Sequence, residues 1–280
     1  MKILIDFSWV YNRYYYVAST KGNINDLAET VSSMLSQFFL KVITSYSNAE
    51  VFAVLDSPTT TLENFKIFEG YKQNRNKEEK KKVYASLKEI VLNVKERVPE
   101  ISFIKAKGYE ADQVIAYMSK NSKDKVIIFS GDKDLLQLTS FSNVKVSNKF
   151  ENGKFLILTD SEIFEKFKNS KGEDFTRVST NKRDILKYRS LKGDSSDNLS
   201  SVFPRIKDKE IIDIIRNYWV DNQEEGLTGE RIEKILEDLE GDNPVLAGKL
   251  RENKEVWLRN YKIMNLTDIS EDIKICMLKP

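Results

Sequence analysis

The sequence predicts an α/β fold in which a mainly parallel central sheet is flanked by helices and followed by a C-terminal helical subdomain. Two observations support this prediction. Short apolar runs alternate with longer helical patterns in the first half, and only helical patterns follow about residue 160. Short apolar runs without polar alternation are typical of strands buried on both faces. Strands that alternate with helices favour a parallel sheet with helices on each side.

The first half supplies the strands of this sheet. An apolar stripe at helical spacing, from Leu27 to Tyr46, separates the first two runs, and a second stripe from Val83 to Val98 precedes the third. The predicted strands are Ile3–Ile5, Val51–Leu55, Ile101–Ile104 and Val126–Phe129.

The second half contains helical patterns and no Pro/Ser-rich linker, so the two parts are expected to share a broad interface. The predicted helices are Ile163–Phe167, Lys182–Leu191, Glu210–Trp219, Arg231–Leu239 and Val256–Ile263. We therefore predict a core domain over residues 1–175 and a helical subdomain over residues 176–280.

Composition restricts the chemistry. The 280 residues include one cysteine and no histidine, which excludes an internal disulfide, histidine-ligated zinc and catalytic pairs built on imidazole. The net charge of +2 does not by itself indicate a class of partner. The sequence shows no signal peptide and no apolar stretch of membrane-spanning length, which needs about 20 residues. We expect a cytoplasmic, monomeric protein with no membrane partner.

Acidic residues follow the predicted strands. Because the carboxyl ends of parallel strands meet at one edge of a sheet, acids from four strand ends should converge there, and a pair from the second half could join them. A single acid in such a place is usually a helix cap or the start of a turn. Eight such acids would repel one another unless cations neutralise them or some of them stay protonated. The eight are Asp6, Asp56, Glu110, Asp112, Asp132, Asp134, Asp194 and Asp197.

All-oxygen ligands suit Mg²⁺ or Mn²⁺. Two such ions about 4 Å apart can clamp the attacking and leaving oxygens of a phosphodiester. The acids therefore predict metal-assisted phosphoryl chemistry.

At these residues the chain resembles the 5′-nuclease family, which includes flap endonucleases, the 5′-nuclease domain of bacterial DNA polymerase I and phage ribonuclease H. The similar segments occur in the family's order over about residues 1 to 200. The tail, with Trp257–Lys262 and Asp268-Ile269, is similar to T-even phage ribonuclease H. The five segments are Asp6-Phe7-Ser8 with Arg13, Tyr71–Arg75, Tyr109–Asp112, Ser130–Leu138 and Leu191–Asn198.

The resemblance implies a structure-specific 5′-nuclease, acting as a 5′ to 3′ exonuclease or flap endonuclease and removing primers in DNA replication or repair. It implies that Glu110, Asp112 and Asp132 hold a first metal ion, helped through water by Asp6 and Asp56. Asp132, Asp134, Asp194 and Asp197 would hold a second. Lys72 and Arg75 would contact the scissile phosphate. Its partners would be DNA and RNA–DNA duplexes with 5′ ends, flaps or nicks, and a single-strand-binding protein or sliding clamp.

Basic residues mark the expected nucleic-acid contacts. From Lys66 to Arg97 there are ten Lys or Arg against five Glu. A solvated helix face is the simpler interpretation, but beside an acidic pocket we favour a basic arch, at about residues 66–98, that guides a single strand. Here we expect contacts from Tyr71, Lys80, Lys81 and Lys82, and elsewhere from Arg13.

One segment departs from the family pattern. Many relatives carry a Gly-Ile-Gly hairpin after the last acidic motif, whereas residues 202–209 contain no glycine. Duplex binding by the helical subdomain would then use Arg205, Lys207 and Lys209.

Two alternatives remain open. One is a branched-DNA-binding protein of the same fold that has lost catalysis, although every expected acid is present. The other is a metal-dependent phosphatase, although Asp6-Phe7-Ser8 lacks the second acid of an Asp-x-Asp motif.

Overall fold

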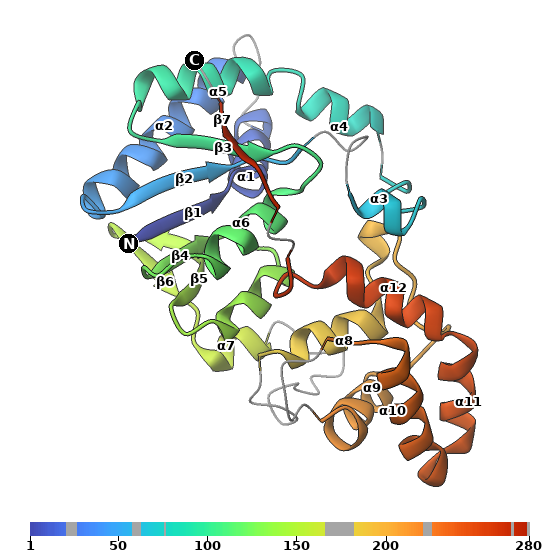
Figure 1. Ribbon diagram of the computed structural model, residues 1–280. Helices are drawn as coiled ribbons and strands as arrows, with labels where there is room; N and C mark the ends of the chain where they lie inside the picture. The colour runs from blue at the N-terminus through green and yellow to red at the C-terminus, as the bar shows by residue number, and fades with distance from the viewer. Residues whose placement is uncertain are drawn as a thin grey trace. The chain divides into compact units, whose positions relative to one another are not determined.

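The structure is a computed structural model, and its chain divides into two compact units (Figure 1). The described residues are 1–20, 27–57, 63–75, 77–165, 182–220, 226–269 and 272–278. Unit 1 comprises Met1–Leu62, Asn76–Leu158 and Ile269–Pro280, and unit 2 comprises Glu63–Arg75 and Thr159–Asp268. The predicted domain boundary at residues 175/176 lies outside the described residues. The segment predicted as one basic arch, about residues 66–98, is divided between the units after Arg75.

Unit 1 is built on a sheet. In the part of the chain that the structure describes, seven strands form one sheet in the order β6-β5-β4-β1-β2-β3-β7. The five strands from β5 to β3 pair in parallel, and the two edge strands, β6 and β7, pair antiparallel with their neighbours. The predicted fold class is confirmed. The strands are β1 (Lys2–Asp6), β2 (Glu50–Val54), β3 (Ser102–Ala106), β4 (Val126–Phe129), β5 (Val144–Glu151), β6 (Lys154–Ile157) and β7 (Ile275–Met277).

Helices cover both faces of this sheet (Figure 1). Helices α1 (Phe7–Thr20), α2 (Leu27–Ser45) and α5 (Leu87–Arg97) lie on one face, and α6 (Ala111–Lys120) lies on the other. A short helix, α4 (Lys77–Val83), precedes α5. The 3₁₀ helix η3 (Asp134–Ser140) follows β4.

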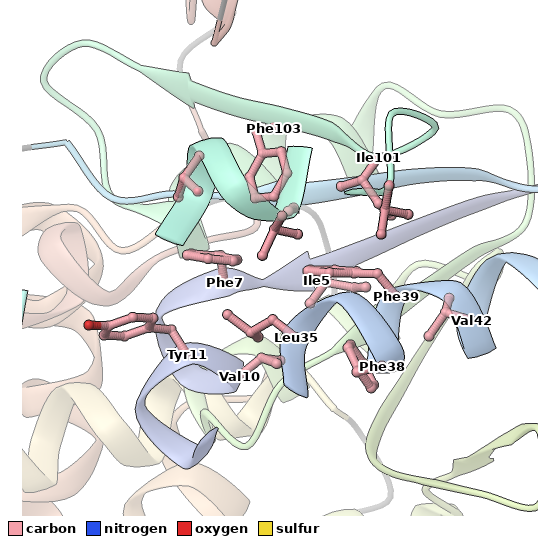
Figure 2. Close-up of a cluster of buried hydrophobic side chains, with 14 of the residues drawn as sticks. Ile5, Phe7, Val10, Tyr11, Leu35, Phe38, Phe39, Val42, Ile101 and Phe103 are labelled. Carbon is pink, nitrogen blue, oxygen red and sulfur yellow. The ribbon is translucent and has the colours of Figure 1, made fainter. Parts of the chain in front are cut away.

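The core lies between the sheet and helices α1, α2 and α5 (Figure 2). Helix α2 forms because Val31, Leu35, Phe38 and Val42 recur at helical spacing and are all buried. Burying each such side chain contributes about 1.5–3 kcal/mol. The ring of Phe7, directly after β1, stacks on Phe39 at 6.5 Å between centroids. This packing fixes the start of α1 on the sheet, where the candidate site begins.

Unit 2 is helical in its described residues. The helix α12 packs against α8, and the fully buried Trp257 of α12 meets the ring of Trp219 edge-on at 5.1 Å. Its α-helices are α3 (Asn64–Ile67), α7 (Asp160–Glu165), α8 (Asp184–Lys192), α9 (Asp208–Asp213), α10 (Gly229–Asp242), α11 (Pro244–Glu252) and α12 (Lys254–Met264). Shorter turns are the 3₁₀ helix η5 (Ser195–Asp197) and the π-helix η6 (Ile214–Tyr218). No helix among the described residues is long and apolar enough to cross a bilayer.

Candidate active site

Asp6 occupies the carboxyl end of the central strand β1. Parallel pairing aligns Ile5 with Phe129, the last residue of β4, so the next residues of the two strands are neighbours. Ser130 Oγ donates a hydrogen bond of 2.7 Å to Asp6 Oδ2. The backbone N–H of Trp9, in the first turn of α1, donates to Asp6 Oδ1 at 3.1 Å. Asp6 thus connects β1, β4 and the start of α1.

Asp56 likewise connects the end of β2 to the start of α6 through hydrogen bonds. Ser8 Oγ donates to Asp56 Oδ2 at 2.6 Å, and the backbone N–H of Ala111 donates to Asp56 Oδ1 at 2.9 Å. Because Ala111 is the first residue of α6, this second bond attaches the helix N-terminus to the end of β2. Asp56 itself remains exposed.

Glu110 and Asp112 lie at the start of α6. Glu110 is the N-cap, is 6% exposed and forms a capping box with Gln113, whose side-chain oxygen accepts a hydrogen bond of 3.0 Å from the Glu110 N–H. Asp112 lies in the first helical turn. Both acids that follow β3 therefore lie at the N-terminus of a helix.

Asp132 and Asp134 follow β4 in a tight turn. The N–H of Asp132 donates to Ser130 Oγ at 3.0 Å, and the N–H of Asp134 donates to Asp132 Oδ1 at 2.8 Å. Gly131 permits this path, since a Cβ there would lie 2.3 Å from Nε1 of Trp9. Ser130 therefore bridges the Asp6 side chain and the backbone of Asp132.

These contacts place acids from four neighbouring strand ends along one edge of unit 1. Burial, and then repulsion from Asp56, raises the pKa of Asp6 from 3.8 to about 7, with a smaller contribution from Asp132. The hydrogen bonds from Ser130 and Trp9 lower this pKa without offsetting the rise. Burial and neighbouring negative charge thus destabilise the ionised form of Asp6, and a bound cation would stabilise it.

An all-oxygen donor set at this edge fits a hard divalent cation such as Mg²⁺. Among the described residues, however, no three acidic or cysteine side chains are already grouped as metal ligands. Asp6, Asp56 and Asp132 instead accept hydrogen bonds from the protein. The proposed ligand set in unit 1 therefore stays a prediction.

Asp6 gives a testable pH dependence. Its folded pKa of about 7 exceeds its ordinary value of 3.8, so between these pH values the native state holds a proton that the unfolded state has lost. The free energy of unfolding should therefore fall, by up to a few kcal/mol, as pH rises from about 4 to 7, and stay level above. Urea unfolding in EDTA at pH 5 and pH 8 measures this fall. The fall should shrink in Asp6→Asn, and an identical fall in this variant would contradict the assignment.

Unit 2 carries the last acidic motif on a closed loop. The N–H of Asp194 donates to the carbonyl of Leu199, and the N–H of Leu199 donates to the carbonyl of Asp194, each at 2.8 Å. Gly193 has φ +74°, and a Cβ there would lie 2.5 Å from the Leu199 carbonyl oxygen, so glycine is required. The Asp194 carboxylate accepts from the Ser196 N–H at 2.8 Å and from Arg189 at 2.6 Å.

The predicted phosphate contacts pack on the same loop. Arg75 Nη2 donates to Asp197 Oδ1 at 2.5 Å, and Lys72 Nζ lies 3.6 Å from Asp197 Oδ2. The Lys72 N–H also donates to the Asp197 carbonyl at 2.9 Å. Lys72 has a φ of 55°, a left-handed conformation that costs a lysine about 1–2 kcal/mol. The loop therefore holds Lys72 in a conformation that the isolated chain disfavours.

The charge around this loop differs from that at the edge of unit 1. Three cations, Arg189, Lys72 and Arg75, contact the two carboxylates of Asp194 and Asp197. Burial raises the pKa of Asp194, but hydrogen bonds from Ser196 and the charge of Arg189 bring it below its ordinary value. The surplus of positive charge suits a phosphate. The predicted second metal set combines Asp132 and Asp134 of unit 1 with these two acids of unit 2, and it stays a prediction.

One predicted contact needs correction. The sequence predicts that Tyr71 contacts nucleic acid, but Tyr71 is 3% exposed and its hydroxyl donates to Asp197 Oδ2 at 3.2 Å. Its ring packs edge-on against Phe65 at 6.2 Å. Tyr71 therefore supports the loop and offers no open face for a base.

The other predicted nucleic-acid residues whose side chains the structure describes are exposed. Arg13 is exposed on α1, with its guanidinium 6.0 Å from the centre of the Trp9 ring, and both residues line a pocket of about 610 Å³. The side chain of Lys80 lies outside the described residues. The exposed remainder comprises Lys81, Lys82, Arg205, Lys207 and Lys209.

The glycine-free segment nevertheless forms a turn. Arg205 has a φ of 63°, the left-handed conformation for which glycine is the usual residue. The segment then enters α9 at Asp208, which accepts hydrogen bonds from Tyr188 and Lys192. The chain therefore turns there without glycine.

Sequence reasoning missed three residues of unit 2. Arg189 binds the Asp194 carboxylate from the last turn of α8. Asn260 is fully buried and donates to the carbonyls of Ser190 and Ser200, at 3.1 and 2.8 Å. Its neighbour Arg259 stands over the ring of Phe68. An asparagine inside an apolar helical stripe is the signal that could have indicated Asn260.

Comparison with known proteins agrees with these observations. The family model described as 5′-3′ exonuclease, N-terminal resolvase-like domain, matches residues 1–168. The chain is 29% identical over 284 residues to a 5′-3′ exonuclease of Aquifex aeolicus (strain VF5), covering 98% of this chain and 86% of that relative. It is 26% identical over 273 residues to one of Mycoplasmopsis pulmonis (strain UAB CTIP), covering 94% of this chain and 80% of that relative.

Solved structures share the fold. The T5 D15 protein co-crystallised with metal ions has a TM-score of 0.65 and 17% identity, covering 95% of this chain and 89% of that chain. T5 5′-exonuclease with bound divalent zinc has a TM-score of 0.64 and 18% identity, with the same coverage. The T-even ribonuclease H likeness of the tail stays a prediction. Since the family model covers more than half of the chain, the protein belongs to the 5′-3′ exonuclease family of 5′-nucleases.

Proposed function

We propose that this protein is a structure-specific 5′-nuclease that hydrolyses phosphodiester bonds near the 5′ ends of DNA and RNA–DNA duplexes, flaps and nicks. The observation that supports this most directly is the linked set of acids at the carboxyl edge of unit 1, where burial and then repulsion from neighbouring carboxylates raise the pKa of Asp6 to about 7. Family membership supports the same activity. The T5 D15 flap endonuclease has been crystallised as a pseudo-enzyme-product complex with DNA and metal ions.

The proposal assigns two Mg²⁺ or Mn²⁺ ions to the acids. Glu110, Asp112 and Asp132 would hold the first, and Asp134 would join Asp132, Asp194 and Asp197 in holding the second. When bound, such ions stabilise the negative charge that develops on a phosphodiester and acidify water. Ser130 and Ser8 orient Asp6 and Asp56 through their hydrogen bonds. The chain has no histidine, so no imidazole can move the proton.

Lys72 and Arg75 supply positive charge to the scissile phosphate in this proposal. Both contact Asp197 in the structure, so the loop fixes their positions before a substrate arrives. Preorganised charge of this kind costs little reorganisation when the transition state forms.

Lys81 and Lys82 are proposed to contact the phosphates of a single strand, because both are exposed on α4. Replacing both with alanine should lower the slope of log affinity against log salt by about 1.4, or about 0.7 for each lost contact with single-stranded DNA. Fluorescence anisotropy with a labelled 5′-flap DNA, at several KCl concentrations, measures the slope. The matched control replaces Lys123 and Lys125 with alanine. Both lysines are exposed just before β4, at the amino-terminal end of this strand and away from the acids at its carboxyl end. Equal slopes for the two double variants would remove α4 from the binding surface.

Digestion of end-labelled substrates tests the proposed function. The substrates are a 5′-flap duplex, a nicked duplex and an RNA-primed duplex, each incubated with Mg²⁺ and with EDTA. We expect short 5′ products in Mg²⁺ alone, and the preferred substrate separates exonuclease, flap endonuclease and primer-removing activities. Binding without cleavage under both conditions would instead support a catalytically silent branched-DNA-binding protein.

A further inference from the structure

Arg259 is a partly buried cation in the middle of α12. Its guanidinium carbon lies 4.2 Å from the centre of the Phe68 ring, close enough for a cation–π interaction. Its Nη2 donates to Asn260 Oδ1 at 3.0 Å and lies 3.5 Å from Ser200 Oγ. The planar group is therefore held from one face by a ring and from its edge by an amide oxygen.

No carboxylate among the described residues pairs with Arg259. The neighbouring loop acids have other partners, since Asp197 binds Arg75 and Asp194 binds Arg189. Burial lowers the pKa of Arg259, and no nearby acid counters the effect. A guanidinium has five N–H donors and stays charged in proteins. The structure gives Nη1 no hydrogen-bond partner within the described ranges, so donors remain for an external anion.

The surroundings make this a fixed position rather than a flexible surface arginine. Asn260, which accepts from Arg259, is fully buried and donates to the carbonyls of Ser190 and Ser200. Ser200 is exposed and directly follows the closed loop of Asp194 and Leu199. Phe68 directly follows α3 and precedes the segment of Lys72 and Arg75. Arg259 thus lies where both segments of the candidate phosphate site meet α12.

We propose that Arg259 binds a backbone phosphate of the nucleic acid beside the phosphate that Lys72 and Arg75 contact. Phe68 and Asn260 are positioning residues that orient its guanidinium, and the Ser200 hydroxyl is a second donor. A planar, preoriented guanidinium matches two phosphate oxygens, which a lysine cannot do. This assignment rests on the proposed nuclease function, because it takes a nucleic-acid strand as the ligand.

The test compares Arg259→Gln with Arg251→Gln. Arg251 is the matched control, since it pairs with Glu240 at 2.8 Å and with Glu233 at 3.7 Å. Fluorescence anisotropy measures the affinity for a labelled 5′-flap DNA in EDTA between about 0.05 and 0.3 M KCl. Arg259→Gln should weaken binding about tenfold at ~0.1 M salt and lower the salt slope by about 1. Arg251→Gln should stay within about twofold of wild type, since its cation is already paired.

Arg259→Lys separates charge from shape. It should keep the salt slope of wild type and still bind more weakly, because the charge remains while the planar fork is lost. This variant also serves if Arg259→Gln fails to show the thermal unfolding transition of wild type. A purely structural role for Arg259 predicts slower cleavage with affinity and salt slope unchanged, and that result would overturn the proposal.

Cleavage and binding by the wild-type protein distinguish a failure of the Arg259 assignment from a failure of the proposed nuclease function. If wild type cleaves the flap in Mg²⁺ and Arg259→Gln binds as wild type does, only the Arg259 assignment is wrong. If wild type neither cleaves nor binds the flap, the proposed function fails and the Arg259 assignment fails with it.

Discussion

Replacing Asp132 with asparagine should lower the rate of flap cleavage about 10³-fold or more, while DNA affinity changes little. Metal charge contributes several kcal/mol of transition-state stabilisation, and each 1.36 kcal/mol is about a factor of ten in rate. Asparagine keeps the side-chain oxygen that accepts from the Asp134 N–H, so the turn after β4 should persist. Binding should persist because cationic side chains provide the affinity for phosphates. Single-turnover cleavage and anisotropy measure the two effects separately.

The matched control for this prediction is Asp124→Asn. Asp124 is exposed and lies just before β4, at the edge of the sheet opposite Asp132. The Asp124→Asn substitution removes the same charge from the same unit but away from the candidate site, so we expect cleavage at the wild-type rate. Wild-type turnover by Asp132→Asn would contradict the assigned role, and equal losses in the two variants would point to net charge rather than to the site.

Replacing Lys72 with alanine should lower the maximal cleavage rate about 10²–10³-fold, as the loss of one preorganised transition-state donor commonly does. The Lys72 side chain is 8% exposed and lies against the Tyr71 ring, with its Nζ 4.9 Å from the ring centre. The loop should survive, since Asp197 retains Arg75 and the Tyr71 hydroxyl. Steady-state kinetics should show a lower kcat with a nearly unchanged KM.

Lys66→Ala is the matched control for Lys72→Ala. Lys66 lies in α3 of the same unit, is 75% exposed and pairs with Glu63 within one helical turn. Such surface pairs are worth little, so we expect wild-type kinetics. A rise in KM with kcat preserved in Lys72→Ala would show that this lysine binds substrate without acting on the transition state.

The fold of unit 1 was largely predictable because its central strands are buried on both faces. The runs at Ile3–Ile5 and Val126–Phe129 are continuous and apolar, and the structure places strands there. The helical stripe from Leu27 also became a single helix, α2. Patterns of this kind carry strong signals because burial determines every position.

The edges of the sheet were harder to predict. The β5–β6 hairpin was missed, although Asn152 and Gly153, with φ of 50° and 73°, form the Asn-Gly turn typical of two-residue hairpins. Strand β7 is three residues long and pairs antiparallel with β3. A strand this short has no period to detect, and only the tertiary pairing defines it.

The candidate site, like the fold, could be predicted only in part from the sequence. Acids at strand ends could be predicted because parallel topology alone brings those ends to one edge. The ion pairs of Asp197 with Lys72 and Arg75 could not, since they join residues more than 120 positions apart. The burial of Tyr71 and the position of Arg259, which pairs with no carboxylate in the described part of the chain, likewise depend on how the helices of unit 2 pack.

Anomalous diffraction from a crystal soaked in MnCl₂ would test the central claim most directly. We predict a manganese peak at the carboxyl edge of strands β1 to β4, about 2.1 Å from carboxylate oxygens of Glu110, Asp112 or Asp132. An edge without manganese, with Asp6 and Asp56 still bonded only to protein donors, would contradict the claim.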